Sequence, residues 1–318
     1  MKFAVTEAWR DELLLARDAR FPSERVAMAA AVRKGELIRI SRGAYLRRDL
    51  WRALTPDARY RARIAAVAAT SSPELIFGRE SAAAMWRLPW HGPWTARVHA
   101  FDPTLLAGRT TKRVIRHAAG LRALDFVVID GLRVTPLART VVDVAASSDR
   151  YAAVVVADAA LSGRSTAGEV LPKVGHADLR KQLSSIPQRH GSARARDVLE
   201  FADGRSGSPW ESVSRVSIAV AGLPAPELQK AFPKPGGGFW YVDFWWEESN
   251  LIGEFDGKAK YLEAELRGGL SAEEVLYEEK QREDALRARG HRFSRWGSGV
   301  AASPRALATL LLAAGLRP

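Results

Sequence analysis

Two apolar runs separated by a polar turn lie within residues 239–261, FWYVDFWWEESNLIGEFDGKAKY. Runs rich in aromatic and β-branched residues with a polar cluster between them are typical of paired strands. The pattern therefore predicts a hairpin that turns at EESN, residues 247–250. Four charged residues stand inside the segments that should be most buried, namely Asp243, Glu254, Asp256 and Lys258.

The hairpin register brings these charges together. Residues whose numbers sum to 497 face each other whether the loop has two residues or four, so Asp243 lies opposite Glu254. Because strand side chains alternate, Glu254, Asp256 and Lys258 share one face with Asp243. The other face is then the apolar one, with Val242, Phe244, Trp246, Leu251 and Phe255.

Three carboxylates on an apolar hairpin need compensation, because like charges at paired positions are destabilising and buried unpaired charges are costly. A divalent cation would supply it, since carboxylate oxygens suit Mg²⁺ or Mn²⁺, and Lys258 would orient or help deprotonate a water beside a scissile phosphate. In the alternative interpretation, Asp256-Gly257 forms a turn that leaves Asp256 and Lys258 in solvent. Asp243 and Glu254 would then point to water or pair with arginines.

The first 50 residues predict two helices followed by a short hairpin. The first helix covers TEAWRDELLLARDARF (6–21), the second begins near Ser23 and ends at Gly35, and the strands flank Arg42-Gly43. This order predicts a winged helix whose second helix enters the major groove of DNA. The residues expected to contact DNA are Arg25, Arg33 and Lys34 on that helix and Arg39, Arg42, Arg47 and Arg48 on the wing. The alternative is a solvated basic face on a small helical domain.

The remaining chain divides by pattern into a mixed α/β segment (51–165), a helical connector (166–204) and a last domain (205–318), so we expect an α+β multi-domain protein. In the middle segment, Asp130-Gly131 predicts a hairpin turn. His99 and His117 fall in strand patterns without a carboxylate or a second histidine at ligand spacing. We therefore interpret both histidines as core or edge residues.

Composition narrows the classes of function. The chain has 48 Lys+Arg against 36 Asp+Glu, a formal charge of +12 and a pI near 10.3, so its surface field attracts polyanions such as DNA. The absence of cysteine excludes disulfides and thiolate zinc sites and fits a reducing cytoplasm. The longest apolar stretch, near 307–316, is too short to span a membrane, and the N-terminus turns acidic before any apolar signal region. We expect a cytoplasmic protein without a membrane partner.

The stretch D-x(10)-E-x-D-G-K, from Asp243 to Lys258, resembles the PD-(D/E)xK nuclease superfamily. The similar branch contains very-short-patch-repair endonucleases and a related domain of unknown function, and the resemblance covers about residues 205–300. It implies a restriction-endonuclease-like α/β/α domain in which Asp243 and one or both of Glu254 and Asp256 hold Mg²⁺ or Mn²⁺. It also implies that Lys258 is the catalytic lysine.

The same resemblance implies a glutamate on a helix before the hairpin, and SGSPWESVSRVSIAVAGLPAPELQ (206–229) supplies Glu211 as an accessory acid and Gln229 before the first strand. A later helix and strand are matched by SAEEVLYEEKQREDALRARG and HRFSRW. Glu211 has a second interpretation. Ser208-Pro209-Trp210-Glu211 is a capping box with proline at the first helical position, so Glu211 would only close the start of a helix.

Residues from about 20 to 165 resemble the type IV abortive-infection (AbiEi-like) antitoxin family, on the phrases RKGELIRISRGAYL, FGRESAAAMWRLP and DGLRVTPLARTVVDVA. This resemblance implies an N-terminal winged helix, a DNA-binding repressor and a toxin protein as a possible partner. Two functions follow as hypotheses. One is a metal-dependent endodeoxyribonuclease in a defence, repair or toxin-antitoxin context. The other is an antitoxin-like transcriptional repressor whose nuclease-like domain is inactive.

Overall fold

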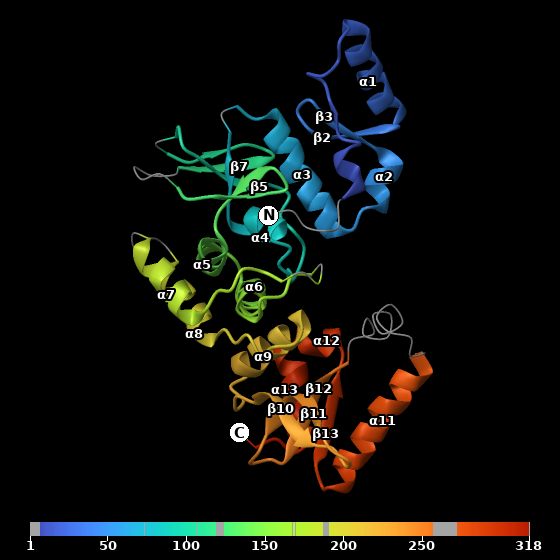
Figure 1. The fold of residues 1–318 in the computed structure, drawn as a ribbon, viewed down its shortest axis with the longest axis vertical. Coiled ribbons are helices and arrows are strands. Elements are labelled where there is room, and N and C mark those ends of the chain that lie inside the picture. Colours follow the sequence, from blue (N-terminus) through green and yellow to red (C-terminus); the bar gives the residue numbers. More distant parts are fainter. Residues whose placement is uncertain are drawn as a thin grey trace. The chain divides into compact units, whose positions relative to one another are not determined.

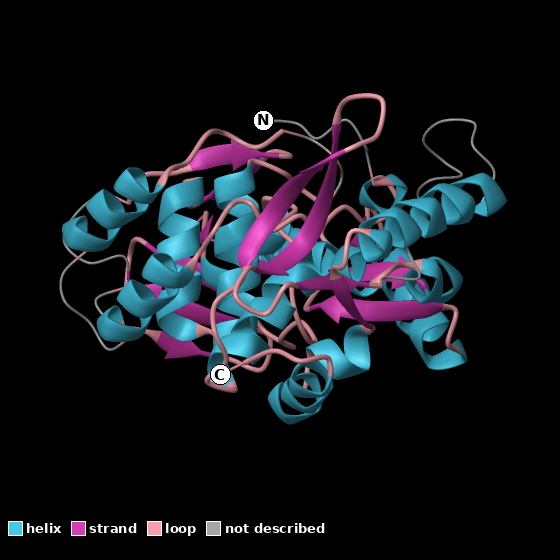
Figure 2. Ribbon diagram, turned by 90° about the horizontal axis from the view of Figure 1, so that it is seen from below, coloured by secondary structure: helices cyan, strands magenta, loops and turns pink. Residues whose placement is uncertain are grey.

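The computed structural model describes residues 7–317 except 73, 106, 119–123, 167, 169, 187–190 and 257–271. The chain forms two compact units, Met1–Ala202 and Asp203–Pro318, here called unit 1 and unit 2. Helices and strands occur in both (Figure 1, Figure 2), so the expected α+β multi-domain class is confirmed at that level. The three segments predicted before residue 205 all belong to unit 1.

Unit 1 begins with a small sheet and one long exposed helix. Its elements are η1 (Ala8–Arg10), β1 (Leu14–Leu15), α1 (Pro22–Lys34), β2 (Leu37–Ser41) and β3 (Ala44–Arg47). The three strands are antiparallel in the order β1-β3-β2. Helix α1 starts with Pro22 in its first turn and ends at Gly35, whose φ of +77° suits glycine.

The helix predicted over residues 6–21 is wrong. A 3₁₀ turn and the short strand β1 occupy this segment instead. Trp9 is buried in the core cluster, Leu13 and Leu15 pack against that cluster, and β1 pairs with β3. Ion pairs also hold Glu7 and Arg10 to other parts of unit 1. These tertiary contacts outweigh a local pattern that fits a helix.

A six-stranded mixed sheet and its helices form the rest of unit 1. The strands, in the order β6-β7-β5-β4-β9-β8, are β4 (Ile76–Phe77), β5 (Val98–Asp102), β6 (Arg109–Thr110), β7 (Val114–Ala118), β8 (Val127–Ile129) and β9 (Leu132–Val134). The helices are α2 (Arg48–Ala53), α3 (Pro56–Thr70), α4 (Arg79–Met85), α5 (Leu137–Ser147), α6 (Arg150–Ser162), α7 (His176–Ser185) and α8 (Ser192–Phe201). The turn predicted at Asp130-Gly131 is confirmed, because both residues have positive φ and join β8 to β9.

Unit 2 is a four-stranded sheet with helices on both faces. Its elements are α9 (Pro209–Val220), β10 (Glu227–Pro233), β11 (Phe239–Trp246), β12 (Leu251–Phe255), α11 (Ala272–Ala288), β13 (Arg292–Trp296), α12 (Ser298–Ala301) and α13 (Pro304–Ala313). The order is β10-β11-β12-β13, and only β12 and β13 are parallel. On the α9 face, Trp296 Nε1 donates to Ser214 Oγ, and on the α11 face Leu286 joins Trp245 and Ile252 in a core cluster.

The hairpin register predicted for β11 and β12 is confirmed. Phe244 pairs with Gly253, Trp245 with Ile252 and Trp246 with Leu251. The predicted apolar face is wrong at one position, because Val242 packs with Trp245 and Ile252, whereas Phe244 stacks on Trp296 of the opposite face. The alternation of side chains therefore changes between Val242 and Phe244, in the part of β11 beside Gln229, whose φ is +52°.

Candidate functional site

The two acidic residues predicted to face each other lie where the β11–β12 ladder ends. Phe244 is the β11 residue farthest from the turn that still pairs with β12. Asp243 directly precedes it in the sequence and lies toward the open end of the hairpin. Its Oδ2 accepts the backbone N–H of Phe255 at 2.9 Å. A carboxylate thus satisfies a backbone donor at the end of β12, so the charge of Asp243 helps to shape the strand end that carries Glu254.

Glu211 and Asp243 approach the same side chain. Gln229 Nε2 donates to Glu211 Oε2 at 3.1 Å and lies 3.4 Å from Asp243 Oδ1. Gln229 stands opposite Asp243 in the strand register, with a left-handed backbone that is unusual for a non-glycine residue inside a strand. Such backbone strain clusters at functional sites.

Glu211 also serves the helix start, as the second interpretation predicts. Its backbone N–H donates to Ser208 Oγ at 3.2 Å, while Oε2 accepts the N–H of Gly207 at 2.7 Å. A Cβ at Gly207 would lie 3.1 Å from the Glu211 carboxylate and 3.2 Å from the Gln229 amide, so glycine leaves the room that this contact needs. Glu211 is buried. Through these hydrogen bonds it caps the start of α9, and through Gln229 it connects to Asp243.

Glu254 is buried and ion-paired. Its Oε2 accepts hydrogen bonds from Arg282 of α11 and Arg295 of β13, each at 2.9 Å. Its Oε1 lies 2.8 Å from Arg282 Nη2 but accepts no directed hydrogen bond within the described residues. Burial raises the pKa of Glu254, and the nearby charge of Asp243 adds to that rise, while Arg282 and Arg295 oppose it. Glu254 thus follows the alternative in which arginines pair with the carboxylate.

Two further residues of the predicted site follow Glu254 in the sequence, Asp256 and Lys258. Asp256 is exposed after the end of β12, where its backbone N–H donates to Trp296 O at 2.9 Å. Lys258 lies outside the described residues. In the part of the chain that the structure describes, no group of three or more His, Cys, Asp or Glu side chains could hold a metal ion. The assignment of the metal ligands therefore stays a prediction.

Apart from half-buried Arg48, the basic residues predicted for DNA contact are exposed, and Figure 1 shows α1 at one end of unit 1. Helix α1 carries Arg25, Arg33 and Lys34, and it has no buried residue. Of the wing residues, Arg39 and Arg42 are exposed on and after β2. Arg47 on β3 is exposed but ion-paired with Asp49, whose carboxylate lies 2.8 Å away. The residues of α1 are exposed or half-buried, so most of its surface is open to solvent or to a partner.

Sequence reasoning missed a second basic surface around Trp51. Two adjoining pockets of about 300 and 530 Å³ share Arg39 and Trp51. Arg59 and Arg63 lie over the Trp51 ring, 5.8 and 5.6 Å from its centroid. The six arginines that line the two pockets are Arg39, Arg48, Arg52, Arg59, Arg63 and Arg113, and no acidic residue lines either one. The density of arginine in RRDLWRALTPDARYRAR was the available signal, but it could not reveal Arg113.

His99 and His117 lie in strands, as expected for core or edge residues, but the sequence did not reveal that they lie next to each other. The parallel pairing of β5 and β7 brings His117 Nε2 to 3.2 Å from His99 Nδ1. The Glu80 carboxylate lies 3.8 Å from His99 Nε2. Burial, together with the charges of Arg79 and Arg97, lowers the pKa of His99 to about 4. Linear spacing could not show this contact, because β6 and its turns separate the two strands in sequence.

Comparison with known proteins gives relatives without a described activity. No family model matches the chain. Two uncharacterized proteins of Mycobacterium tuberculosis are similar, Rv2248 of strain ATCC 25618 / H37Rv and MT2308 of strain CDC 1551 / Oshkosh. Each is 28% identical over 225 residues, which are 71% of this chain and 75% of the relative.

Among solved structures, the crystal structure of the RV2827C protein from Mycobacterium tuberculosis gives a TM-score of 0.36 at 15% identity. The match covers 71% of this chain and 86% of that protein, and no fold is assigned from it.

Within the described residues, no helix combines the length and apolar character needed to cross a membrane.

Proposed function

We propose that the protein binds DNA through unit 1 and hydrolyses DNA phosphodiester bonds at the acidic hairpin of unit 2 with the help of Mg²⁺ or Mn²⁺. The observation that carries the proposal is the site around Asp243. Its carboxylate holds the end of β12, the printed pairing of β11 with β12 ends directly beside Asp243 and Glu254, and the strained residue Gln229 connects Asp243 to buried Glu211. The resemblance to the PD-(D/E)xK superfamily supports the same residues.

The donor chemistry of this hairpin suits a hard divalent cation. Asp243 and Glu254 offer carboxylate oxygens, and Glu254 Oε1 is buried without a directed hydrogen bond in the described part of the chain. Asp243 and Glu254 would hold the cation, with Asp256 as a further ligand. Bound there, the cation would polarise a phosphate oxygen and lower the pKa of a water molecule.

The protein's own residues have separate roles in this proposal. Asp243 orients the end of β12 through the N–H of Phe255, and Gln229 fixes the Asp243 carboxylate relative to Glu211. Arg282 and Arg295 compensate the charge of Glu254 while no cation is bound. Lys258 would orient or deprotonate the attacking water, as the superfamily resemblance implies.

DNA binding by unit 1 is supported by charge and exposure. Helix α1 carries the exposed cations Arg25, Arg33 and Lys34, which suits a helix that enters the major groove of DNA. The Trp51 pockets add arginines that suit phosphate contacts. The predicted winged helix and the resemblance to the antitoxin family support the same proposal.

The decisive experiment is Mg²⁺- or Mn²⁺-dependent cleavage of plasmid and mismatch-containing DNA by the full chain. Asp243→Asn, Glu254→Gln and Lys258→Met should abolish cleavage without loss of DNA binding. Glu247→Gln changes an exposed acid at the turn of the same hairpin and is the matched control, so it should cleave as the wild type does. Cleavage that persists in Asp243→Asn would refute the assignment of the site.

One observation favours a second function, that of a DNA-binding repressor with an inactive unit 2. Two arginines already neutralise Glu254, so the hairpin is stable without a cation. This reading is supported by the antitoxin resemblance, which adds a toxin protein as a possible partner. Salt-sensitive DNA binding without cleavage of any substrate, together with repression of a reporter promoter, would favour it over the nuclease.

A further inference from the structure

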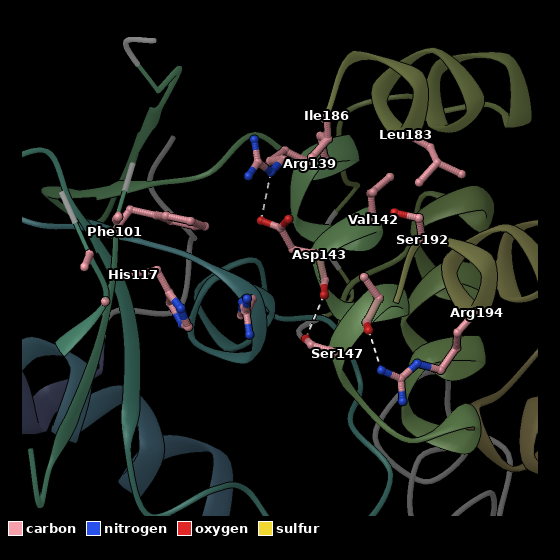
Figure 3. Close-up of a pocket in the computed structure, with 15 residues that line it drawn as sticks. Phe101, His117, Arg139, Val142, Asp143, Ser147, Leu183, Ile186, Ser192 and Arg194 are labelled. Carbon is pink, nitrogen blue, oxygen red and sulfur yellow. Dashed lines mark hydrogen bonds and ion pairs between the residues drawn. The ribbon is translucent and has the colours of Figure 1, made fainter. Parts of the chain in front are cut away.

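A pocket of about 660 Å³ in unit 1 takes no part in the proposed function. Figure 3 shows Phe101 and His117 on one side of it and Arg139, Val142 and Arg194 on the other. The walls come from β5 and β7, from α5, and from α7 and α8. Its volume lies within the range of small-molecule sites, about 300–1,000 Å³.

Positive charge dominates the lining. Arg79, Arg139 and Arg194 come from three different helices, while Asp143 is the one carboxylate among the lining residues. Asp143 Oδ2 accepts from Arg139 Nε at 2.9 Å, which leaves a local excess of two positive charges. Guanidinium groups match phosphate oxygens in planar pairs, so this excess suits a phosphate better than a neutral ligand.

Fixed contacts hold two of the arginines in position. The Arg139 guanidinium lies 5.4 Å from the Phe101 ring centroid, and its Nη atoms meet no acceptor within the described residues. Arg194 Nη2 donates to Ala146 O at the end of α5. A Cβ at Gly191 would lie 2.2 Å from the same carbonyl oxygen, and Gly191 has φ +96°, so only glycine lets the start of α8 approach α5 this closely.

The backbone at the third arginine is strained. Arg79 has a φ of +53°, a strained conformation for a non-glycine residue that is enriched at ligand sites. It directly follows Gly78, where a Cβ would lie 2.4 Å from the Phe101 ring. Glycine at 78 therefore lets the start of α4 approach Phe101 and sets Arg79 at the pocket wall.

We propose that this pocket binds a small organic phosphate of nucleotide size. Arg79, Arg139 and Arg194 hold the phosphate, and His117 adds a ring nitrogen beside it. Phe101, Val142, Leu183 and Ile186 supply the apolar surface for the organic part of the ligand.

The test is isothermal titration of the full chain with AMP and with inorganic pyrophosphate, and adenosine is the uncharged control. Arg194→Gln should weaken AMP binding by about tenfold or more, because a charge-assisted contact is lost. Arg196→Gln alters an exposed arginine of the same helix that does not line the pocket, and it should bind AMP within about twofold of the wild type. The double variant Arg139→Met with Asp143→Asn should lose binding without leaving Asp143 unpaired.

The Trp51 pockets also offer arginines to a phosphate. Arg63→Gln alters one of these pockets only, so it tells whether AMP binds there or in the 660 Å³ pocket. AMP binding that falls in Arg63→Gln and stays unchanged in Arg194→Gln would overturn the proposal. The proposal would also be overturned if neither AMP nor pyrophosphate bound at millimolar concentration, or if adenosine bound as tightly as AMP. The outcome does not depend on DNA cleavage, because none of these variants touches unit 2.

Discussion

The carboxylate of Asp243 accepts the backbone N–H of Phe255 at 2.9 Å, beyond the last paired residues of the two strands. This contact gives one side chain a structural and a chemical role at once. The two roles can be separated, because asparagine keeps an oxygen acceptor at the same place but loses the charge, whereas alanine loses both.

We therefore expect Asp243→Asn to abolish metal-dependent cleavage while it lowers the free energy of unfolding only slightly. Asp243→Ala should abolish cleavage and also lower the free energy of unfolding of unit 2 by about 1–3 kcal/mol, because it leaves the N–H of Phe255 without its acceptor. Urea denaturation measures the second effect and plasmid cleavage the first. Equal stability of the two variants would show that the contact with Phe255 contributes nothing.

Arg282 provides a test of the cation that does not depend on activity. In Arg282→Met, Glu254 keeps only Arg295, so the variant should lose about 1–3 kcal/mol of stability, less than the complete breaking of a buried pair. If Asp243 and Glu254 hold Mg²⁺, millimolar Mg²⁺ should restore much of this loss, and the thermal midpoint of the variant should rise more than that of the wild type.

Arg287→Met is the matched control, because Arg287 pairs with Glu283 on the same helix and is half exposed. It should lose little stability and respond to Mg²⁺ as the wild type does. A thermal midpoint of Arg282→Met that Mg²⁺ leaves unchanged would argue against a cation at this hairpin and in favour of the repressor.

The hairpin shows what local pattern can and cannot predict. The register of β11 and β12 followed from two apolar runs and a four-residue turn, because a slip by one residue would turn every side chain to the wrong face. The position of Val242 did not follow, because the regular alternation of side chains is broken between Val242 and Phe244, beside the left-handed Gln229, and the residue types there carry no signal for such a break.

The sequence pattern could not predict the partners of Glu254 and His99, for another reason. Arg295 meets Glu254 through the parallel pairing of β12 with β13, and His99 meets His117 through the parallel pairing of β5 with β7. Parallel strands are joined by long connections, so their registers are set by packing rather than by a turn. The same dependence on distant contacts explains why residues 6–21 fit a helix in sequence but form β1 in the structure.

The arginines around Trp51 predict how DNA binding should depend on salt. Each phosphate contact that is lost should lower the slope of log K against log salt concentration by about 1. Arg63 and Arg113 both line the smaller Trp51 pocket. Arg63→Gln and Arg113→Gln should each lower this slope and weaken the affinity for all DNA sequences to a similar extent. Fluorescence anisotropy at several salt concentrations measures it.

Arg180→Gln is the control for this series, because Arg180 is an exposed arginine of α7 that lines neither Trp51 pocket. It should leave the slope unchanged. Identical slopes for the wild type and for Arg63→Gln would place the phosphates elsewhere, and the same measurement on Arg33→Gln would then show whether α1 alone carries the DNA.

His99 makes the stability of unit 1 depend on pH. Its side chain is 11% exposed, and burial followed by the charges of Arg79 and Arg97 lowers its pKa from 6.5 to about 4. Below pH 6.5 the unfolded chain binds a proton that folded His99 rejects, so the free energy of unfolding should fall as the pH drops from 6.5 to about 4. The loss attributable to this group is on the order of 3 kcal/mol.

His99→Gln removes the titrating ring and should flatten this part of the pH profile relative to the wild type. His291→Gln in unit 2 is the control and should leave the profile unchanged, since the pKa of His291 is lowered less by its partial burial. Urea denaturation across the window compares the three proteins, and NMR titration of the His99 ring gives its pKa directly. A ring that titrates near its ordinary value would mean that His99 is hydrated, and the contact with His117 would then be a weaker one than the 3.2 Å separation implies. A depressed pKa would instead show that His99 stays neutral in the folded protein across this pH window, as its burial between β5 and the neighbouring elements predicts.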